Sequence, residues 1–217
     1  MQTIVLATGN PHKVDELRAI LGSSAGVKLI GLREAALASG ANELGEPAET
    51  GRTFEENASI KALAYSEQTG KPCLADDSGL EIDILGGKPG VISSHYCTDG
   101  EDVGMTRPER DAANNRKVLM QMEEVPWDRR GARFVCVMVL AHAGRVLATS
   151  RGEFEGRIGI PPTVPRGENG FGYDPLFLVA PDFAATSAEL SPEEKNRVSH
   201  RARAAELMAQ RIRALVH

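Results

Sequence analysis

Near its start the chain reads Ile4-Val5-Leu6-Ala7-Thr8-Gly9-Asn10-Pro11-His12-Lys13, an apolar run followed by a polar corner. The apolar run predicts a buried strand, and Val14, Leu17 and Leu21 share one face of the helix expected next. Asn10 suits the N-cap of that helix, and Pro11 suits its first position, where a missing N–H costs nothing. The corner therefore lies where a strand ends and a helix begins.

This corner suits a phosphate. The unpaired N–H groups and the positive dipole end of a helix N-terminus attract anions, and Lys13 adds a charge on the first turn. The run lacks the glycine spacing of a Walker A loop and that of a dinucleotide fingerprint. The alternative is an ordinary strand-to-helix turn in which Gly9 and Asn10 only make the corner, and these residues alone leave both interpretations open.

Composition limits the class of protein. A chain of 217 residues with 41% hydrophobic content can form one α/β domain or two small lobes around a substantial core. A net charge of −5 argues against a general nucleic-acid binder, which needs a basic face. The sequence has neither a signal-peptide pattern nor a run of membrane-spanning length, so we expect a cytoplasmic protein that contacts no membrane. The three cysteines lack the spacing of a zinc site or disulfide framework, and Cys136, in an apolar run, is expected in the core.

The expected elements alternate between strands and helices, which predicts a mixed α/β fold. Strands are expected at 3–7, 27–32, 73–76, 80–85, 132–140, 146–154 and 176–179, and helices at 11–21, 54–69, 111–122 and from 192 onward. Thr53 and Ser191 each precede a glutamate by three residues, the spacing of a capping box. Ser199 is also suited to cap a new helix, so the C-terminal helical stretch is either one helix or two. Segments 43–51, 86–104 and 167–173 are expected to be loops.

Two adjacent carboxylates, Asp76 and Asp77, follow a short apolar run in the sequence LADDSGLEID. Mg²⁺ prefers oxygen ligands and commonly takes one or two carboxylates together with substrate phosphates. A carboxylate beside such a metal can also accept a proton from an attacking water. The alternative is a polar β-turn at 76–79. The candidate phosphate site favours the metal, because phosphate chemistry needs one.

Two later segments suit a planar base. Residues 167–175, GENGFGYDP, place glycines around two aromatic rings and a carboxylate, and an exposed ring can stack on a base. The alternative is that these rings cap the core. Lys195 and Ser199-His200-Arg201 form the other segment, because an arginine fork suits a purine carbonyl and ring nitrogen. Its alternative is a solvated helix face, and Lys61 taken alone is ordinarily a surface lysine.

Together these blocks resemble the inosine-triphosphate pyrophosphatase family, whose members are also described as XTP/dITP diphosphatases. The matching segments are 8–13 (T-G-N-x-x-K), 53–58 with Lys61 (T-F-x-E-N-A), 75–80 followed by Gly86-Gly87 and Pro89-Gly90 (A-D-D-S-G-L), 170–175 (G-F-G-Y-D-P) and 193–201 (E-E-K-N with S-H-R). They occur in the family's order over almost the whole chain, and chance matches should not share order and spacing. One departure is Ser93-Ser94-His95-Tyr96, where many members have Ala-Arg before the tyrosine.

The resemblance implies a fold and a reaction. The fold is α/β: a single domain over 1–217 with an elongated mixed β-sheet flanked by helices, in two lobes with a central active-site cleft. The reaction is Mg²⁺-dependent hydrolysis of ITP, dITP and XTP to the nucleoside monophosphate and pyrophosphate, which cleanses the nucleotide pool. The resemblance also implies a homodimer.

It further implies roles for individual residues. Asp77 would activate water as the general base, and Mg²⁺ would be held by Glu49, Asp76 and Asp77. The phosphates would contact Thr8, Gly9, Asn10, Pro11, His12 and Lys13, with Lys61 neutralising charge and Ser78 also touching substrate. The base and sugar pocket would contain Phe171, Gly172, Tyr173, Asp174, Lys195, His200 and Arg201, with Arg201 contacting O6 or N7 of the purine. The stretch 98–110 receives no role.

Two other functions stay open from the sequence. A Maf-type pyrophosphatase would act on modified pyrimidines or dTTP-like substrates, and the blocks at 171–174 and 199–201 disfavour it. A catalytically silent nucleotide-binding protein is disfavoured because Asp76, Asp77 and Lys61 are all present.

Overall fold

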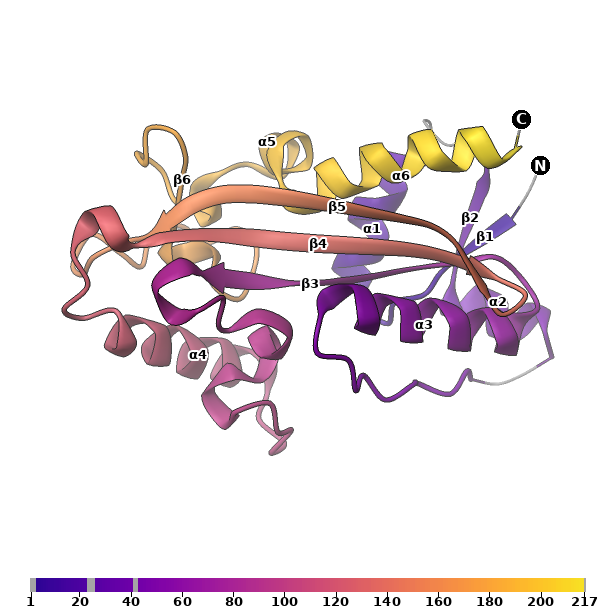
Figure 1. The fold of residues 1–217 in the computed structure, drawn as a ribbon, viewed down its shortest axis with the longest axis horizontal. Helices are drawn as coiled ribbons and strands as arrows, with labels where there is room; N and C mark the ends of the chain where they lie inside the picture. Colours follow the sequence, from indigo (N-terminus) through magenta and orange to yellow (C-terminus); the bar gives the residue numbers. More distant parts are fainter. Residues whose placement is uncertain (1–2, 23–25, 41–42, 217) are drawn as a thin grey trace. The chain divides into compact units, whose positions relative to one another are not determined.

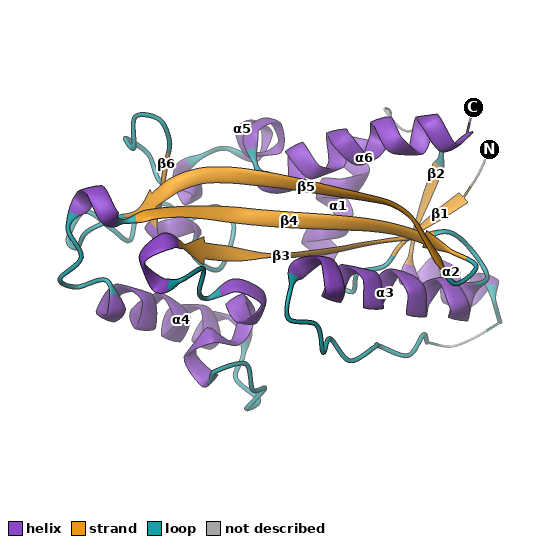
Figure 2. Cartoon of the chain, viewed as in Figure 1, coloured by secondary structure: helices purple, strands orange, loops and turns teal. Residues whose placement is uncertain are grey.

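The computed structural model of the chain describes residues 3–22, 26–40 and 43–216 (Figure 1). Its sheet has six strands in the order β2-β1-β3-β4-β5-β6, and Figure 2 shows them among the helices. β1 is parallel to β2 and β3, whereas β5 is antiparallel to β6, so the sheet is mixed. The strands are β1 (Thr3–Leu6), β2 (Lys28–Gly31), β3 (Cys73–Ile82), β4 (Gly131–His142), β5 (Arg145–Ile158) and β6 (Phe177–Val179). The predicted α/β sheet flanked by helices is confirmed.

The α-helices agree with the helical stretches expected from the sequence, with two exceptions given below. They are α1 (Pro11–Leu21), α2 (Leu32–Ala38), α3 (Phe54–Thr69), α4 (Arg107–Gln121), α5 (Pro192–Val198) and α6 (His200–Val216). The predicted capping boxes form at Thr53 and at Ser191, each with the glutamate three residues on. Among the described residues, none of these helices is long and apolar enough to cross a bilayer.

The chain divides into two compact units. The first unit contains Met1–Ser78, Cys136–Gly152 and His200–His217, and the second contains Gly79–Val135 and Glu153–Ser199. β3, β4 and β5 therefore contribute residues to both units.

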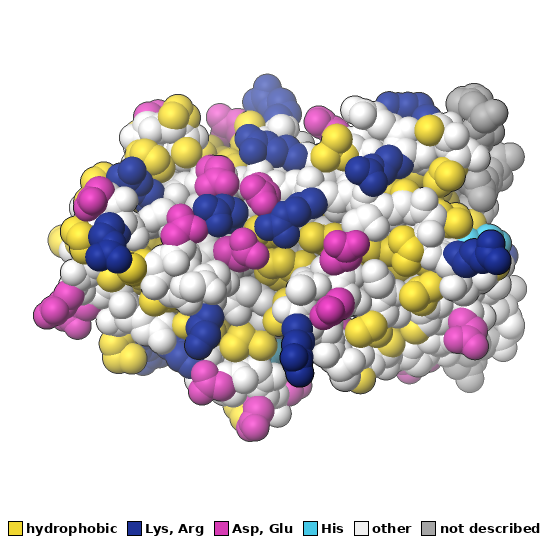
Figure 3. Space-filling view, in the orientation of Figure 1, with side chains coloured by type: hydrophobic (Ala, Val, Ile, Leu, Met, Phe, Trp, Pro, Cys, Tyr) yellow, Lys and Arg dark blue, Asp and Glu magenta, His cyan; other side chains and the backbone are white. Residues whose placement is uncertain are grey.

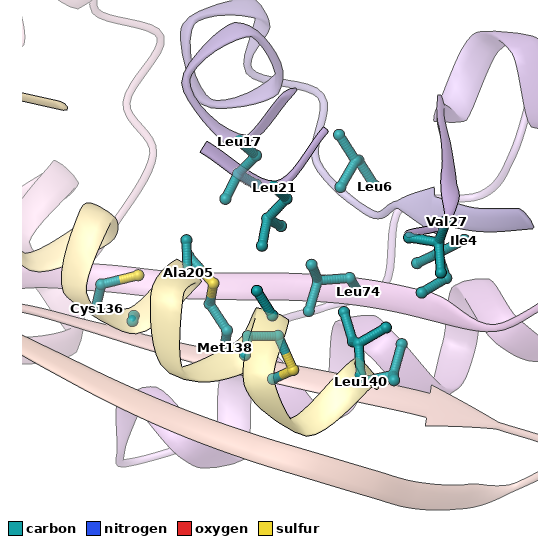
Figure 4. Packing of buried hydrophobic residues seen from close by; sticks show 14 residues of the cluster. Ile4, Leu6, Leu17, Leu21, Val27, Leu74, Cys136, Met138, Leu140 and Ala205 are labelled. Carbon is teal, nitrogen blue, oxygen red and sulfur yellow. The ribbon is translucent and has the colours of Figure 1, made fainter. Parts of the chain in front are cut away.

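The core of the first unit lies between two helices and the sheet. Leu17 and Leu21 of α1 point toward Leu74 of β3 and Met138 of β4, and Ala205 of α6 joins the same cluster (Figure 4). These side chains recur at helical spacing on α1 and at every second position on the strands, which is why one face of each element is apolar. Cys136 lies fully buried in this cluster, as predicted.

The core of the second unit is built around aromatic rings and one buried cation. Phe177 contacts Phe134 and Phe154, with ring centroids 4.6 and 5.6 Å away. Arg130 is 1% exposed, and its guanidinium donates only to backbone carbonyls, those of Met122, Val125, Ile158 and Gly159. Arg130 therefore ties the end of α4 to the end of β5.

Two expected elements differ in the structure, and one helix was not expected at all. β3 is one continuous strand, and the break expected at 77–79 is wrong. Gly79 serves a close approach there, because a Cβ on it would clash with Ser93 Oγ. α2 was missed, although its run LREAALA favours a helix. α4 begins at Arg107 instead of Asp111, because Thr106 and Glu109 form a capping box. The C-terminal stretch, left open as one helix or two, is two helices, with Ser199 between them.

Candidate active site

The pairing of β1 with β3 brings the first two predicted segments together. Leu6 is in register with Leu74, and Ala7 N–H donates to Leu74 O, so the corner after β1 lies beside Asp76. α1 starts at Pro11, and Asn10 O accepts the bond from Val14 N–H that begins it, as expected for an N-cap position. Lys13, on the first turn, places its Nζ 2.8 Å from Asp76 Oδ2.

The corner between β1 and α1 has open space beside Gly9. A Cβ built on Gly9 would meet no atom within 4 Å, and Thr8 Oγ1 accepts from Asn10 N–H at 3.2 Å. The side chains of Pro11 and His12 lie outside the described residues, so their predicted phosphate contacts stay predictions.

Asp76 is a buried anion surrounded by cations. Its side chain is 1% exposed, and besides Lys13 it lies 3.6 Å from Arg201 Nε. Burial alone would raise the pKa of Asp76, but the charges of Lys13, Arg201 and Lys61 outweigh it and hold that pKa well below the ordinary value. Asp76 is therefore a permanent carboxylate at neutral pH.

Asp77, the next residue, is held differently. Asn57 Nδ2 donates to Asp77 Oδ2 at 3.2 Å, and Lys61 Nζ lies 3.4 Å from Oδ1. Burial raises the pKa of Asp77 by more than Lys61 and Lys13 lower it, and Glu49 raises it further. The two adjacent carboxylates thus shift in opposite directions, which separates a fixed charge from a proton acceptor.

Lys61 of α3 joins Asp77 to the acidic loop before the helix. Its Nζ lies 2.8 Å from Glu49 Oε2 as well as 3.4 Å from Asp77 Oδ1. Burial lowers the pKa of Lys61, but Asp77, Asp76 and Glu49 raise it by more, so the ammonium stays charged. The predicted set of Glu49, Lys61, Asp76 and Asp77 is therefore brought together.

The loop that carries Glu49 is attached to α3 at two points. Gln68 exchanges two hydrogen bonds with the backbone of Gly45, and Gly51 N–H donates to Asn57 Oδ1 at 2.8 Å. A Cβ on Gly51 would lie 2.6 Å from that oxygen, so only glycine allows this approach. Asn57 thus orients both the loop and Asp77. Asn57 was not predicted as a site residue, although it stands in the T-F-x-E-N-A block.

Arg201, at the start of α6, contacts two carboxylates and one hydroxyl. Its Nη1 donates to Glu16 Oε2 at 2.6 Å, its Nη2 to Ser78 Oγ at 3.1 Å, and Asp76 faces Nε. Glu16 was also missed. The signal for it is its position three residues after Lys13, on the same side of α1. His200 is buried beside Arg201 in the sequence. The predicted contact of Arg201 with a purine stays a prediction.

A second cluster, within the second unit, gathers the glycine-rich loop and Lys195. Asp174 is 4% exposed and accepts from Lys195 Nζ at 2.6 Å, Ser187 Oγ at 2.8 Å and Phe171 N–H at 2.9 Å. Phe171 is 37% exposed, as a stacking ring requires. Tyr173 is buried and donates through its hydroxyl to Ser93 O, so of the two rings it caps the core.

The donor set fits a hard divalent cation that arrives with a phosphorylated ligand. Asp76 Oδ1 is buried and has no hydrogen-bond partner among the described residues. Within 3–22, 26–40 and 43–216, however, no preformed group of three or more histidine, cysteine or acidic residues is placed to hold a metal. Mg²⁺ often takes only one or two protein carboxylates and completes its shell with phosphate and water.

On the face drawn in Figure 3, acidic and basic side chains are interspersed.

Comparisons with known proteins agree with the motifs. Residues 4–211 match the Ham1 family. A dITP/XTP pyrophosphatase from Pseudomonas aeruginosa is 47% identical over 98% of this chain and 98% of its own, and one from Frankia alni is 45% identical with the same coverage. A HAM1 protein structure from Coxiella burnetii has a TM-score of 0.81 at 40% identity, covering 97% of this chain and 98% of that one. The Staphylococcus aureus Ham1 protein has a TM-score of 0.79 at 33% identity, covering 99% and 100%. The resemblance drawn from the motifs is confirmed, and the chain belongs to the Ham1 family.

Proposed function

We propose that this protein hydrolyses deaminated purine nucleoside triphosphates, such as dITP, XTP and ITP, to the nucleoside monophosphate and pyrophosphate. The observation that carries the proposal is the pair Asp76 and Asp77, with Lys13 Nζ 2.8 Å and Arg201 Nε 3.6 Å from Asp76, and Lys61 Nζ 3.4 Å from Asp77. A triphosphate needs positive charge, and its hydrolysis needs a proton acceptor beside it. The names of the relatives supply the substrate class.

In this proposal Asp77 accepts the proton of the attacking water. The water oxygen bonds to phosphorus at the α–β anhydride, and the bridging bond breaks with its electron pair leaving on pyrophosphate. The Asp77 carboxylate supplies the proton acceptor that hydrolysis needs. Asn57 and Lys61 each contact one of its oxygens, which fixes the carboxylate toward the water.

The charge of the triphosphate is met from several sides. Lys13 and the start of α1 face the phosphates at the corner where Gly9 leaves room. Lys61, which lies between Glu49 and Asp77, adds positive charge beside the phosphates. Mg²⁺, when bound, would neutralise phosphate charge and polarise the reacting bond. Asp76 through Oδ1, Asp77 and Glu49 are the residues that would hold it.

The second cluster serves the base and sugar. Phe171 offers a ring for stacking, and Asp174 with Lys195 offers a fixed polar pair. Donors aimed at a 6-oxo group are left unpaired by the amino group of adenine, and such a mismatch rejects ATP strongly. For Arg201 to contact the base, its fork must first release Ser78 or Glu16.

Pyrophosphate release from ITP, XTP, dTTP and ATP tests the substrate class. We expect turnover of ITP and XTP with Mg²⁺ and little turnover of ATP. Preferred turnover of dTTP would support the Maf-type alternative, and binding of ITP without turnover would support a silent nucleotide-binding protein.

We also propose that the protein forms a homodimer, and sedimentation velocity of the purified protein tests this.

A further inference from the structure

Helix α4 carries three side chains, spaced four residues apart, that contact one short loop in the second unit. Asp111 Oδ2 accepts from Gly172 N–H at 3.0 Å, and Asn115 Nδ2 donates to Gly172 O at 3.0 Å. The Arg107 guanidinium lies 4.3 Å from the ring centroid of Phe171. Residues four apart share a helix face, so α4 presents one stripe to the loop: Arg107, Asp111 and Asn115.

The loop needs such support because two glycines flank Phe171. Gly170 and Gly172 have φ values of 83° and 63°, a region that glycine enters easily, so the free backbone has many conformations to lose. Asp111 and Asn115 engage both backbone polar groups of Gly172. Asp174 Oδ2 accepts from the N–H of Phe171 itself, at 2.9 Å.

Arg107 occupies its place because of where α4 begins. Thr106 and Glu109 cap the helix, so Arg107 is its first residue and reaches Phe171, while Asp111 lies 4.0 Å from Arg107 Nε. The guanidinium covers part of the ring and leaves 37% of Phe171 exposed. A flat cation on an aromatic ring is a stable stack that fixes the ring's orientation.

We propose that Arg107, Asp111 and Asn115 are positioning residues that hold Phe171 in the orientation that stacks on the purine base. The inference rests on the proposed function, in which Phe171 contacts the base. The stripe acts on base affinity and leaves the hydrolytic step at Asp77 unchanged. It also gives a role to the end of the 98–110 stretch, to which the sequence assigned none.

Steady-state kinetics with ITP tests the stripe. Losing the arginine stack or the Gly172 hydrogen bond should raise KM about fivefold in Arg107→Ala and in Asp111→Ala, with kcat within about twofold of wild type. Asp111→Asn keeps an acceptor for Gly172 N–H and should recover most of the KM loss. The matched control is Arg116→Ala, an exposed arginine of α4 outside the stripe, which should leave both constants unchanged.

Amide hydrogen exchange of the peptide containing Phe171 and Gly172 gives a second, activity-independent readout. Exchange should speed up in Asp111→Ala and stay at the wild-type rate in Arg116→Ala. If wild type hydrolyses ITP but the stripe variants keep its KM, or lose kcat at constant KM, the inference is wrong and the proposed function stands. If wild type hydrolyses no deaminated purine triphosphate, the proposed function fails together with the base-positioning role. Unchanged exchange in Asp111→Ala would overturn the claim that α4 holds the loop.

Discussion

Replacing Asp76 with asparagine removes a buried charge that two cations contact directly. Lys13 Nζ lies 2.8 Å and Arg201 Nε 3.6 Å from Asp76 Oδ2, and the Asp76 and Arg201 side chains are 1% and 4% exposed. Removing one partner of a buried ion pair leaves the other charge poorly solvated, which costs about 3–5 kcal/mol. Glu16 still pairs with Arg201 at 2.6 Å, so we expect Asp76→Asn to lower the free energy of unfolding by about 3 kcal/mol, near the lower end.

The pH dependence of this loss has a definite sign. Burial raises the pKa of Asp76, but Lys13, Arg201 and Lys61 lower it by more, so the folded value lies below the unfolded value of about 3.9. A group with a depressed folded pKa contributes stability above its unfolded pKa, and that contribution disappears as pH falls through the folded pKa. The difference between wild type and Asp76→Asn should therefore be constant from about pH 5 to 8 and shrink below about pH 4.

Urea unfolding followed by circular dichroism, in EDTA, measures the difference. The control is Asp99→Asn, because the Lys117–Asp99 pair is as short, at 2.7 Å, but Asp99 is 84% exposed. We expect no measurable change in the unfolding midpoint of the control. A loss under about 1 kcal/mol in Asp76→Asn, or equal losses in both variants, would refute the argument from burial.

Three further predictions follow from other parts of the structure. Arg130→Met leaves four backbone carbonyls without their donor, so we expect a loss of about 3–5 kcal/mol in the free energy of unfolding. The control Arg116→Met, at an exposed position, should have a small effect, and equal effects in both variants would contradict the role given to Arg130. Burial raises the pKa of the Cys136 thiol to about 12 and also raises the pKa of the buried Cys73. A chromogenic thiol reagent at about pH 8 should therefore modify neither cysteine until urea unfolds the protein. Reaction of either cysteine in the native protein would contradict the core described here. Lys61 Nζ lies between Glu49 and Asp77, so nucleotide-free Lys61→Met should bind Mn²⁺ more tightly than wild type. Electron paramagnetic resonance measures the Mn²⁺ affinity, and the control Lys28→Met, at an exposed position, should bind like wild type. Unchanged affinity in Lys61→Met would show that these carboxylates do not bind the metal.

Local signals in the sequence predicted most of the helices and strands. Thr53 and Ser191 cap helices where expected, and the turn at Ala143-Gly144, with φ values of 50° and 74°, joins the two strands predicted around it. The break expected within 73–85 failed for a non-local reason. Gly79 suggested a turn, but it is glycine because Ser93, fourteen residues later, lies against its backbone.

The candidate site was predictable where its residues stand in motifs. The motifs named Lys13, Lys61, Asp76 and Asp77, and in the structure Lys13 pairs with Asp76 and Lys61 pairs with Asp77. Asn57 and Glu16 were missed because their importance lies in what they contact across the fold: Asp77 is twenty residues from Asn57, and Arg201 is 185 residues from Glu16. The opposite pKa shifts of Asp76 and Asp77 were equally hidden, because they depend on burial and on cations from three helices.

The most direct test of the proposed reaction is phosphorus NMR of the products formed from ITP and Mg²⁺ by wild type and by Asp77→Asn. Wild type should give inosine monophosphate and pyrophosphate in equal amounts. Asp77→Asn should be about 10²–10⁴-fold slower at a similar KM, because it keeps the shape of Asp77 but cannot accept the proton. Inorganic phosphate with inosine diphosphate as the wild-type products, or a rate in Asp77→Asn close to that of wild type, would contradict the account.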